Sequence, residues 1–515
     1  MHHYQAMIIG GGLAGLSAAV RLTEQEITDI LVVEQGSGGT PAIAAINFVL
    51  PDNPYGDTPE QYRQDMLAAG YDIGHPELVR DMADNSVAAY ELLGRCGVKF
   101  ARQEDGLLLY RHLSGHHFPR SLCQTDGLIG AQMRGRLRQI LQERGVTFLH
   151  RECVRLLSDG ERVYGVTLLD RKHFNKIDNI YASVVIAAWG GVGHLFPQTT
   201  YPPDVNGRGL AMAWRAGAAL CDLEFVEYEP MVMAYPEATV GEPCPTAMLG
   251  EGAHLVNSKG ERFLMSIRPE GEAGTPKSVI NRAIWEQTQK GLGAPHGGCW
   301  ADLREIDRRV LERYPWFYGR LMQAGVDPCT ELLEVAPMSH SYSGGIQVDR
   351  NYQSTVKGFF AVGEAAGGIH GACRCAGNAA SQAVISGMIC ADYIAASGVC
   401  QVALNRRLPC ERRIEIGIFG RYQPRIQRLV AKGLPIYRSA EVMEAALREI
   451  RAISLEQPVR QDEDTQDLCL TIELILQAAL ARKESRGTHL RLDYPHQDKA
   501  FGHSLTWRKN REEQP

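Results

Sequence analysis

Three short hydrophobic runs along this chain each lead into a glycine-rich turn. Residues 7–9 (MII) precede GGGLAG, residues 183–188 (SVVIAA) precede WGGVG, and residues 358–362 (GFFAV) precede GEAAGG. Short apolar runs bounded by glycines are typical of buried strands. Because glycine lets backbone amides approach a ligand closely, we expect the chain to return three times to one long, buried ligand.

The first of these turns has the spacing of a dinucleotide-binding unit. Gly10, Gly12 and Gly15 form the pattern GxGxxG between a strand and a stretch of helical composition. In such a unit the first glycine makes the tight turn, the second admits the pyrophosphate, and the third lets the helix pack closely. The strand-like run ILVV ends at Glu34, 24 residues after Gly10, where a ribose hydroxyl partner is expected. The pattern therefore predicts dinucleotide binding and leaves NAD and FAD open.

The third turn continues into a stretch that combines an acid with a cation. Glu364 heads the GEAAGG turn, where its carboxylate can accept hydrogen bonds from sugar-type hydroxyls. Arg374 follows in GACRCAGNAASQAV and is the only cation between His370 and Arg406. We interpret residues 336–388 as one site facing a nucleotide cofactor. A glycine-rich turn with a helix-capping arginine is the alternative.

The C-terminal part of the chain has a different pattern. Residues 414–480 are mostly free of Pro–Gly clusters and carry apolar residues at helical spacing, as in VMEAALREI and LCLTIELILQAAL. This spacing predicts a helical bundle. The basic residues that follow are expected to form a solvated helix end: Arg482, Lys483, Arg486 and Arg491.

Composition narrows the class of protein. A chain of 515 residues is too long for one core and predicts two to four domains. The net charge of −6 and the lack of a basic block argue against a nucleic-acid partner. The 13 cysteines have no zinc-ligand or iron–sulfur spacing, so we expect reduced thiols in a cytoplasmic protein without a bound metal. No uninterrupted apolar run of about 18 residues occurs, so we expect no transmembrane segment.

Eight blocks, in order, resemble the flavoprotein family of fumarate reductase, succinate dehydrogenase and L-aspartate oxidase. They are IIGGGLAGLSAA, AAWGGVGHLF, GRGLAMAWRAGAAL, DLEFVEYEP, GEGAHLVNSKGERF, HSYSGGIQVD, GFFAVGEAAGGIHGACRCAGN and ARKESRGTHLRLDYP. The resemblance implies an α/β fold with a discontinuous, Rossmann-like FAD-binding domain, an inserted α+β capping domain that is mobile, and a C-terminal helical region. We expect the FAD-binding domain at residues 1–234 and 334–398, the capping domain at 235–333 and the helical region at 399–515.

The resemblance also implies which residues contact the FAD and the substrate. The cofactor contacts are expected at Gly10, Gly12, Ala14, Gly15, Glu34, Gly39, Thr40, Gly190, Glu364, Asn378, Ala379 and Ala380. His340 in SHSYSGG and Arg374 in HGACRCAGN fall at the family's substrate-binding His and Arg. Such cations hold substrate carboxylates in place and stabilise charge in the transition state.

One departure from the family concerns proton transfer. Lys277 in TPKSVINRAI stands where the family has its proton-shuttling Arg. A guanidinium is always charged, whereas a partly desolvated ammonium can give up a proton near neutral pH. We therefore expect Lys277 to be catalytic. The alternative is a solvated lysine on the capping domain.

Two further departures concern the substrate. Glu229 in DLEFVEYEP replaces the family's carboxylate-binding His. A carboxylate repels a carboxylate, so we expect Glu229 to lie across the pocket from Lys277 and to meet a hydrogen-bond donor of the substrate. Pro245 and Thr246 replace a Thr-Glu pair and Leu249 replaces an Arg, so half of the family's dicarboxylate clamp is missing.

A last departure concerns the cofactor linkage. Residues 36–48 contain no histidine, and Ala44-Ala45-Ile46 stands where the family has Gln-Gly-Gly. The covalent flavin link of the respiratory members cannot form there, so FAD is expected to be bound non-covalently.

Together these features predict an FAD-dependent oxidoreductase that transfers hydride between flavin N5 and a CH–CH or CH–NH bond next to a carboxylate or similar group. Its small-molecule substrate is expected not to be plain fumarate. One alternative is an amino-acid oxidase like L-aspartate oxidase. Others are the flavin subunit of an electron-transfer complex with an iron–sulfur partner, or a flavoprotein that has lost catalysis.

Overall fold

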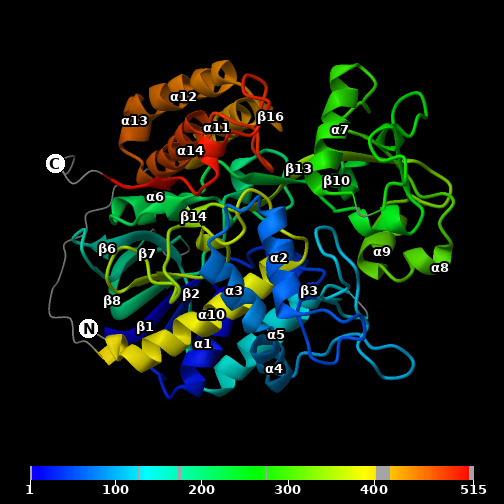
Figure 1. The fold of residues 1–515 in the computed structure, drawn as a ribbon. Coiled ribbons are helices and arrows are strands. Elements are labelled where there is room, and N and C mark those ends of the chain that lie inside the picture. Colours follow the sequence, from blue (N-terminus) through cyan, green and yellow to red (C-terminus); the bar gives the residue numbers. More distant parts are fainter. Residues whose placement is uncertain (1–2, 126, 172–175, 274, 402–417, 510–515) are drawn as a thin grey trace.

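The largest sheet has seven strands in the computed structural model, which describes residues 3–125, 127–171, 176–273, 275–401 and 418–509 (Figure 1). Its strands are β1 (His3–Ile9), β2 (Ile30–Glu34), β5 (Thr147–His150), β6 (Glu152–Ser158), β7 (Val163–Asp170), β8 (Lys176–Ala187) and β15 (Phe359–Ala361). Strands β5, β2, β1, β8 and β15 run parallel in that order, and β6 and β7 extend the sheet antiparallel from β8. In such sheets ligands bind beyond the carboxyl ends of the parallel strands.

The three hydrophobic runs predicted to meet at one ligand are neighbours in this sheet. Ala187 of β8 pairs with Ile9 of β1 on one side and with Ala361 of β15 on the other. The three strands therefore end at the same level, and the glycine-rich turns that follow them lie side by side. This part of the sequence prediction is confirmed.

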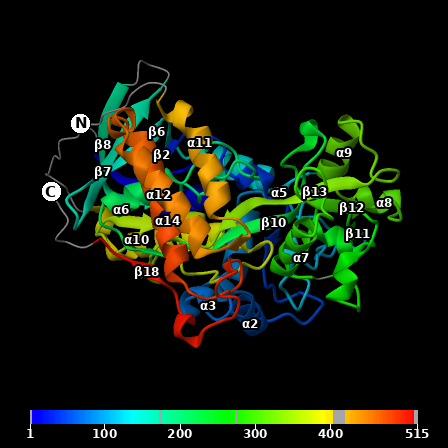
Figure 2. The ribbon, with the colours of Figure 1, turned by 90° about the horizontal axis from the view of Figure 1, so that it is seen from above.

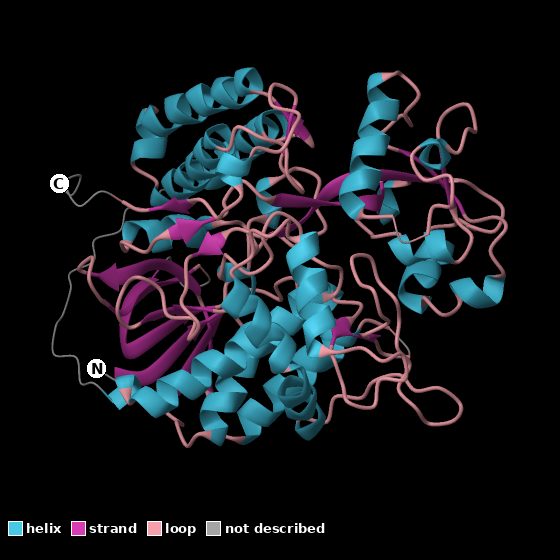
Figure 3. Ribbon diagram, viewed as in Figure 1, coloured by secondary structure: helices cyan, strands magenta, loops and turns pink. Residues whose placement is uncertain are grey.

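Helices pack on the sheet and on one another (Figure 3). They are α1 (Leu13–Glu24), α2 (Pro59–Ala69), α3 (Pro76–Asp84), α4 (Ser86–Arg95), α5 (Ile129–Glu143), α6 (Arg208–Arg215) and α10 (Asn378–Ser397). Helix α10 packs closely on α1, since a Cβ at Gly387 would stand 2.6 Å from the carbonyl oxygen of Ala14.

Helix α10 is also long and apolar enough to cross a membrane, the single such helix in the part of the chain that the structure describes. Two-thirds of its most apolar window is buried inside the protein, and packing against α1 accounts for its composition. The expectation that no segment spans a membrane stays a prediction.

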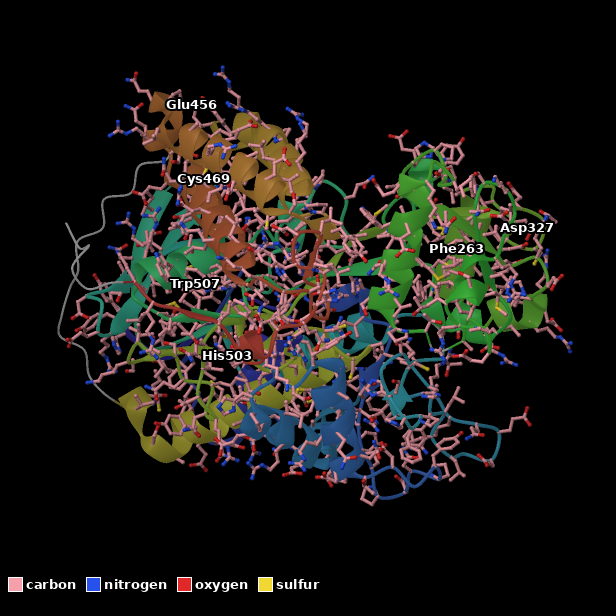
Figure 4. The ribbon with its side chains drawn as sticks, turned by 45° about the horizontal axis from the view of Figure 1, so that its top comes forward. Phe263, Asp327, Glu456, Cys469, His503 and Trp507 are labelled. Carbon is pink, nitrogen blue, oxygen red and sulfur yellow. The ribbon has the colours of Figure 1, made fainter. Side chains whose placement is uncertain are left out.

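A second body lies to the right in Figures 1 and 2 and contains a four-stranded antiparallel sheet. Its strands, in sheet order, are β10 (Val226–Met233), β13 (Leu333–Tyr342), β12 (Cys299–Asp302) and β11 (His254–Val256), with helices α7 (Lys277–Gln289), α8 (Arg308–Leu311) and α9 (Pro315–Gln323). Buried residues from Met231 to Val335 form a hydrophobic core of their own, to which Phe263, labelled in Figure 4, contributes. This is the predicted α+β capping domain. Its proposed limits at residues 235 and 333 stay a prediction.

The C-terminal region is helical, as predicted from its apolar spacing. Its helices are α11 (Ile418–Gly433), α12 (Ala440–Leu455), α13 (Gln457–Arg460) and α14 (Glu463–Ala481). Residues 414–417 of the predicted bundle lie outside the described residues. Figure 4 labels Glu456 between α12 and α13, and Cys469, which is buried in α14.

Short strands complete the fold. The pairs are β3 (Ile46–Asn47) with β4 (Ser121–Leu122), β16 (Tyr437–Arg438) with β17 (Leu490–Arg491), and β9 (Leu220–Cys221) with both β14 (Gly345–Ile346) and β18 (Thr506–Trp507). Because β9 pairs with β18, the tail of the chain lies against the nucleotide-binding part.

The basic residues after α14 are not a solvated helix end, except for Lys483. Arg482 is fully buried, Arg491 is 1% exposed and Arg486 is 8% exposed, whereas Lys483 is exposed. Arg482 pairs with Glu224 at 2.5 Å and with Glu484 at 2.9 Å. The prediction was wrong for Arg482, Arg486 and Arg491. A buried guanidinium needs carboxylate partners, and Glu224, the partner of Arg482, lies too far away in the sequence for a local pattern to indicate the pair.

Replacing Arg482 should therefore destabilise the protein. Arg482→Met leaves the carboxylates of Glu224 and Glu484 buried without this partner, which costs about 3–5 kcal/mol in comparable buried pairs. Lys483→Met, one residue further along, removes the same charge from an exposed position and should be close to neutral. Thermal unfolding of the two variants measures the difference. Equal melting temperatures would show that the buried network is not needed for stability.

Candidate active site

A first cavity opens at the carboxyl ends of the parallel strands. It is lined by most of the predicted cofactor contacts: Gly10, Gly12, Ala14, Gly39, Thr40, Gly190, Glu364 and Ala379. Helix α1 starts at this cavity, and its first turn contains no acidic residue. A free helix N-terminus attracts phosphate groups, so the arrangement suits the pyrophosphate of a dinucleotide.

The geometry of Gly10 and Gly15 agrees with the tight turn and the close helix packing that the sequence predicted, and the approach of a pyrophosphate to Gly12 stays a prediction. Gly10 has a φ of +124°, and a Cβ there would stand 2.1 Å from the carbonyl oxygen of Ala188. A Cβ at Gly15 would stand 2.2 Å from the carbonyl oxygen of Gly10, so only glycine allows α1 to pack this closely. Gly15 supports the turn and does not line the cavity. At Gly12 a side chain would enter the space beside Thr40, whose hydroxyl accepts a hydrogen bond from the Leu13 N–H at 2.9 Å.

Glu364 connects its own turn to the segment after β8 and to the end of β13. Its carboxylate accepts hydrogen bonds from the Gly191 N–H at 3.0 Å, the Tyr201 hydroxyl at 2.9 Å and the Tyr342 N–H at 3.0 Å. Burial raises the pKa of the Glu364 carboxyl to about 7, even though these hydrogen bonds and the charge of Arg374 lower it. Its side chain is therefore fixed in the cavity wall.

Glu34 ends β2 beside Gly11, as expected, but it does not line the cavity. Its carboxylate accepts hydrogen bonds from Arg138 at 2.6 and 2.7 Å and from Arg134 at 3.3 Å, both on α5. The sequence analysis missed these two arginines because they lie about a hundred residues away. The contact between Glu34 and a ribose stays a prediction.

The side chain of Asn378 lies away from both cavities, and its predicted contact with the FAD stays a prediction. This side chain is fully buried. The Asn378 Oδ1 accepts hydrogen bonds from Tyr62 and from Asn47, both at 2.6 Å. Asn378 therefore fixes the start of α10, while Ala379 and Ala380, which follow it, line the second cavity.

A second cavity of about 1940 Å³ joins the first and reaches the capping domain. Gly38, Gly39, Tyr201 and Ala379 line both cavities. All four predicted catalytic side chains line the second one: Glu229, Lys277, His340 and Arg374. The structure thus brings the predicted catalytic residues together next to the predicted cofactor site.

A β-bulge directs His340 into this cavity. In the pairing of β10 with β13, Glu227 faces Ser341 and Tyr228 faces Ser339, so His340 is the extra residue between them. Bulges re-aim side chains in this way and are common next to active sites. As a result, His340 Nε2 lies 3.5 Å from Glu229 Oε2, and His340 Nδ1 lies 2.9 Å from the Thr200 hydroxyl.

Lys277 and Glu229 form an ion pair and do not face each other across the pocket. Lys277 Nζ donates to Glu229 Oε2, and their side chains are 18% and 6% exposed. Lys277 is the first residue of α7, where the helix dipole opposes a cation, so the pairing offsets an unfavourable position. Burial and the charges of Lys277 and Arg374 hold the pKa of His340 well below its usual range, so its imidazole is neutral at pH 7.

Arg374 is held by a residue that the sequence analysis did not single out. The backbone N–H of Arg374 donates to Glu227, and its guanidinium Nη2 lies 3.5 Å from Glu227 Oε2 and 3.1 Å from the Ser341 hydroxyl. Burial opposes ionisation of Glu227, but the charge of Arg374 and these hydrogen bonds hold its pKa below the usual range. The guanidinium Nε is buried without a hydrogen-bond partner, so Arg374 keeps donor capacity for a ligand.

The wall next to Lys277 contains the replaced clamp residues. Pro245, Thr246 and Leu249 line the cavity, the last two in a short helical segment (Thr246–Gly250). This wall offers one hydroxyl and no cation. Ala44 and Ala45 also line the cavity, whereas Ile46 is fully buried. Among the described residues, no group of three or more His, Cys, Asp or Glu side chains is arranged to hold a metal ion.

Comparison with known proteins agrees with this arrangement. A family model described as FAD binding domain matches residues 5–380, and one described as Fumarate reductase flavoprotein C-term matches residues 423–515. One subunit of the fumarate reductase (CoM/CoB) of Methanothermobacter marburgensis is 30% identical over 96% of this chain and 95% of its own length. L-aspartate oxidase of Streptomyces coelicolor is 30% identical over 98% of this chain and 90% of its own.

Solved structures of fumarate reductases have a similar fold. A variant of the quinol fumarate reductase of E. coli has a TM-score of 0.83 and 25% identity, covering 97% of this chain and 93% of that one. The fold and the joined cavities thus define an FAD-binding flavoprotein oxidoreductase. The chain belongs to the flavoprotein family of fumarate reductase, succinate dehydrogenase and L-aspartate oxidase.

Denaturation should release the flavin. No histidine occurs in residues 36–48, and none is found among the described residues that line the first cavity. Acid precipitation should therefore leave the yellow colour in the supernatant, where absorbance measures it. Colour that remains in the washed pellet would contradict non-covalent binding.

Gly12→Asp should abolish FAD binding. The new carboxylate would stand at the N-terminus of α1, where the pyrophosphate must approach the backbone. Gly135→Asp is a matched control, because Gly135 lies on α5 with no atom within 4 Å of an added Cβ. The flavin-to-protein ratio after purification should fall to near zero in the first variant and stay unchanged in the second. Retained flavin in Gly12→Asp would overturn the role of this turn.

Proposed function

We propose that the protein transfers hydride between the flavin of bound FAD and a CH–CH or CH–NH bond next to a carboxylate or similar electron-withdrawing group, and that plain fumarate is not its substrate. Bound FAD supplies the hydride donor or acceptor. The observation that carries the proposal is that Lys277, Arg374 and His340 line one cavity that joins the predicted cofactor site.

The residues of the chain have separate roles in this reaction. Arg374, with its guanidinium in the cavity wall, anchors an anionic or electron-rich group of the substrate and stabilises charge that develops beside it. Lys277 moves the proton at the carbon next to the one that exchanges hydride, and Glu229 holds its ammonium in place. Neutral His340 orients the substrate by hydrogen bonding.

The two departures that concern the substrate support a substrate other than fumarate. A dicarboxylate needs cations at both ends, and here the wall at Pro245, Thr246 and Leu249 has none. Glu229 adds a carboxylate to the same cavity. A screen of candidate substrates that follows bleaching and reoxidation of the flavin tests the proposal. Fumarate reduction or succinate oxidation as efficient as the best reaction found would contradict it.

A second candidate is an amino-acid oxidase. Glu229 favours it, because a carboxylate in the cavity can meet a substrate ammonium, and an L-aspartate oxidase is among the relatives. Peroxide formed with a single amino acid would distinguish it from a dehydrogenase or reductase. Co-purification of a cysteine-rich iron–sulfur chain would instead show that this flavoprotein is one component of an electron-transfer complex.

Lys277→Met should remove turnover while binding is largely kept. General acid–base groups contribute about 10²–10⁴-fold to rate, so kcat for the substrate found by the screen should fall by about that factor. Lys290→Met is the matched control, because Lys290 is exposed at the other end of α7. Rapid-mixing kinetics of flavin reduction or reoxidation measure the step. A Lys277→Met enzyme with near-normal kcat would assign the proton transfer to another residue.

A further inference from the structure

Two carboxylates on one strand neutralise the two predicted catalytic cations, Lys277 and Arg374. Glu229 pairs with Lys277, and Glu227 pairs with Arg374. The two glutamates are two residues apart on β10, so their side chains point to the same face of the strand. The cations reach them from different elements, Lys277 from α7 and Arg374 from the turn before α10.

Burial makes this charge balance important for binding. Glu227 and Glu229 are each 5% exposed, and the Arg374 side chain is 6% exposed. In such surroundings a charge interacts several times more strongly with its neighbours than it does in water. A ligand charge in the cavity therefore meets each cation together with its carboxylate partner, and the two effects largely cancel.

The other side chains near these pairs do not change the balance. Burial and the neighbouring cations keep His340 neutral, and Pro245, Thr246 and Leu249 carry no charge. Four further arginines line the cavity: Arg102, Arg111, Arg309 and Arg313. Three are solvent-exposed, and Arg111 is half-buried with its guanidinium over the Tyr314 ring. Among the described residues, none of the four forms an ion pair with Glu227 or Glu229.

Building on the proposed function, we infer that the substrate binds without net charge and presents an N–H donor to Glu229. It is an uncharged amide or a zwitterion with one carboxylate, and it is not a dicarboxylate dianion. A dianion would bring two charges to the part of the cavity where Lys277 and Arg374 are already paired, and one end would face Glu229. An amide or ammonium group instead gives the Glu229 carboxylate a second donor beside Lys277.

The test is equilibrium binding to oxidised holoenzyme, followed by the change in flavin absorbance. The probes have similar length and differ in charge: succinate is a dianion, β-alanine is a zwitterion and succinamide is uncharged. Succinate should bind at least about tenfold more weakly than the tighter of the two neutral probes, because like charges in the cavity are costly. Tighter binding of β-alanine would identify a zwitterion, and tighter binding of succinamide an uncharged amide.

Charge-removing variants make the test specific to the two glutamates. Glu227→Gln and Glu229→Gln keep hydrogen-bonding groups and remove one negative charge each. Each variant should strengthen succinate binding about tenfold relative to the neutral probe. Glu312→Gln removes the same charge from an exposed residue that lines the cavity on the capping domain. It should change the ratio of the dissociation constants for succinate and the neutral probe by no more than about twofold.

Flavin content of each variant shows whether it has folded, and the second glutamate variant keeps the test valid if the first fails to fold. Succinate binding as tight as that of the neutral probes in the unmodified enzyme would overturn the inference. No binding of any probe by the unmodified enzyme or the glutamine variants would overturn it too. Because the measurement needs no turnover, its result does not depend on the role of Lys277 in the proposed reaction.

Discussion

The pairing of β10 with β13 is the constraint on which the active site depends. These strands lead into and out of the capping domain, and they carry Glu227, Glu229, His340 and Ser341. The bulge in their pairing directs His340 toward Glu229. A register shift by one residue would turn the glutamates to the opposite face, away from Lys277 and Arg374. The chemistry of the site therefore rests on one stretch of backbone hydrogen bonding.

The C-terminal helical region fixes the start of this pairing. Glu224, two residues before β10, is fully buried and pairs with Arg482, and its carbonyl oxygen accepts a hydrogen bond from Arg438 at 2.7 Å. Tyr228 on β10 donates its hydroxyl hydrogen to the carbonyl of Leu434 at 2.5 Å. Breaking such buried pairs is costly, so the helical region resists movement of β10. The terminal region thus supports the active site, and none of its described residues lines either cavity.

The sequence was sufficient to predict what depends on local pattern. Glycine spacing after short apolar runs indicated the cofactor turns, and the resemblance located Lys277, His340 and Arg374. It was not sufficient for partners of charged groups that depend on tertiary pairing. Glu227 was missed because no sequence motif distinguishes it from other strand residues. Its role follows from its contact with Arg374, which lies 147 residues away. The side-chain partners of Asn378 were missed for the same reason: Tyr62 and Asn47 lie more than 300 residues earlier.

The replacements at positions 229 and 277 are best understood as one change. A half-buried Lys277 at the start of α7 without Glu229 would be an unpaired cation against the helix dipole. Glu229 without Lys277 would be an unpaired carboxylate in the cavity wall, which is similarly unfavourable. Only the pair is compatible with a stable, closed site. The pair also makes hydrogen bonding important for substrate discrimination. A ligand that leaves a buried polar group without a partner loses more binding free energy than a ligand with a misplaced apolar contact. In this cavity we expect net charge to exclude a dianion, and the positions of the hydrogen-bonding groups to discriminate among ligands without net charge.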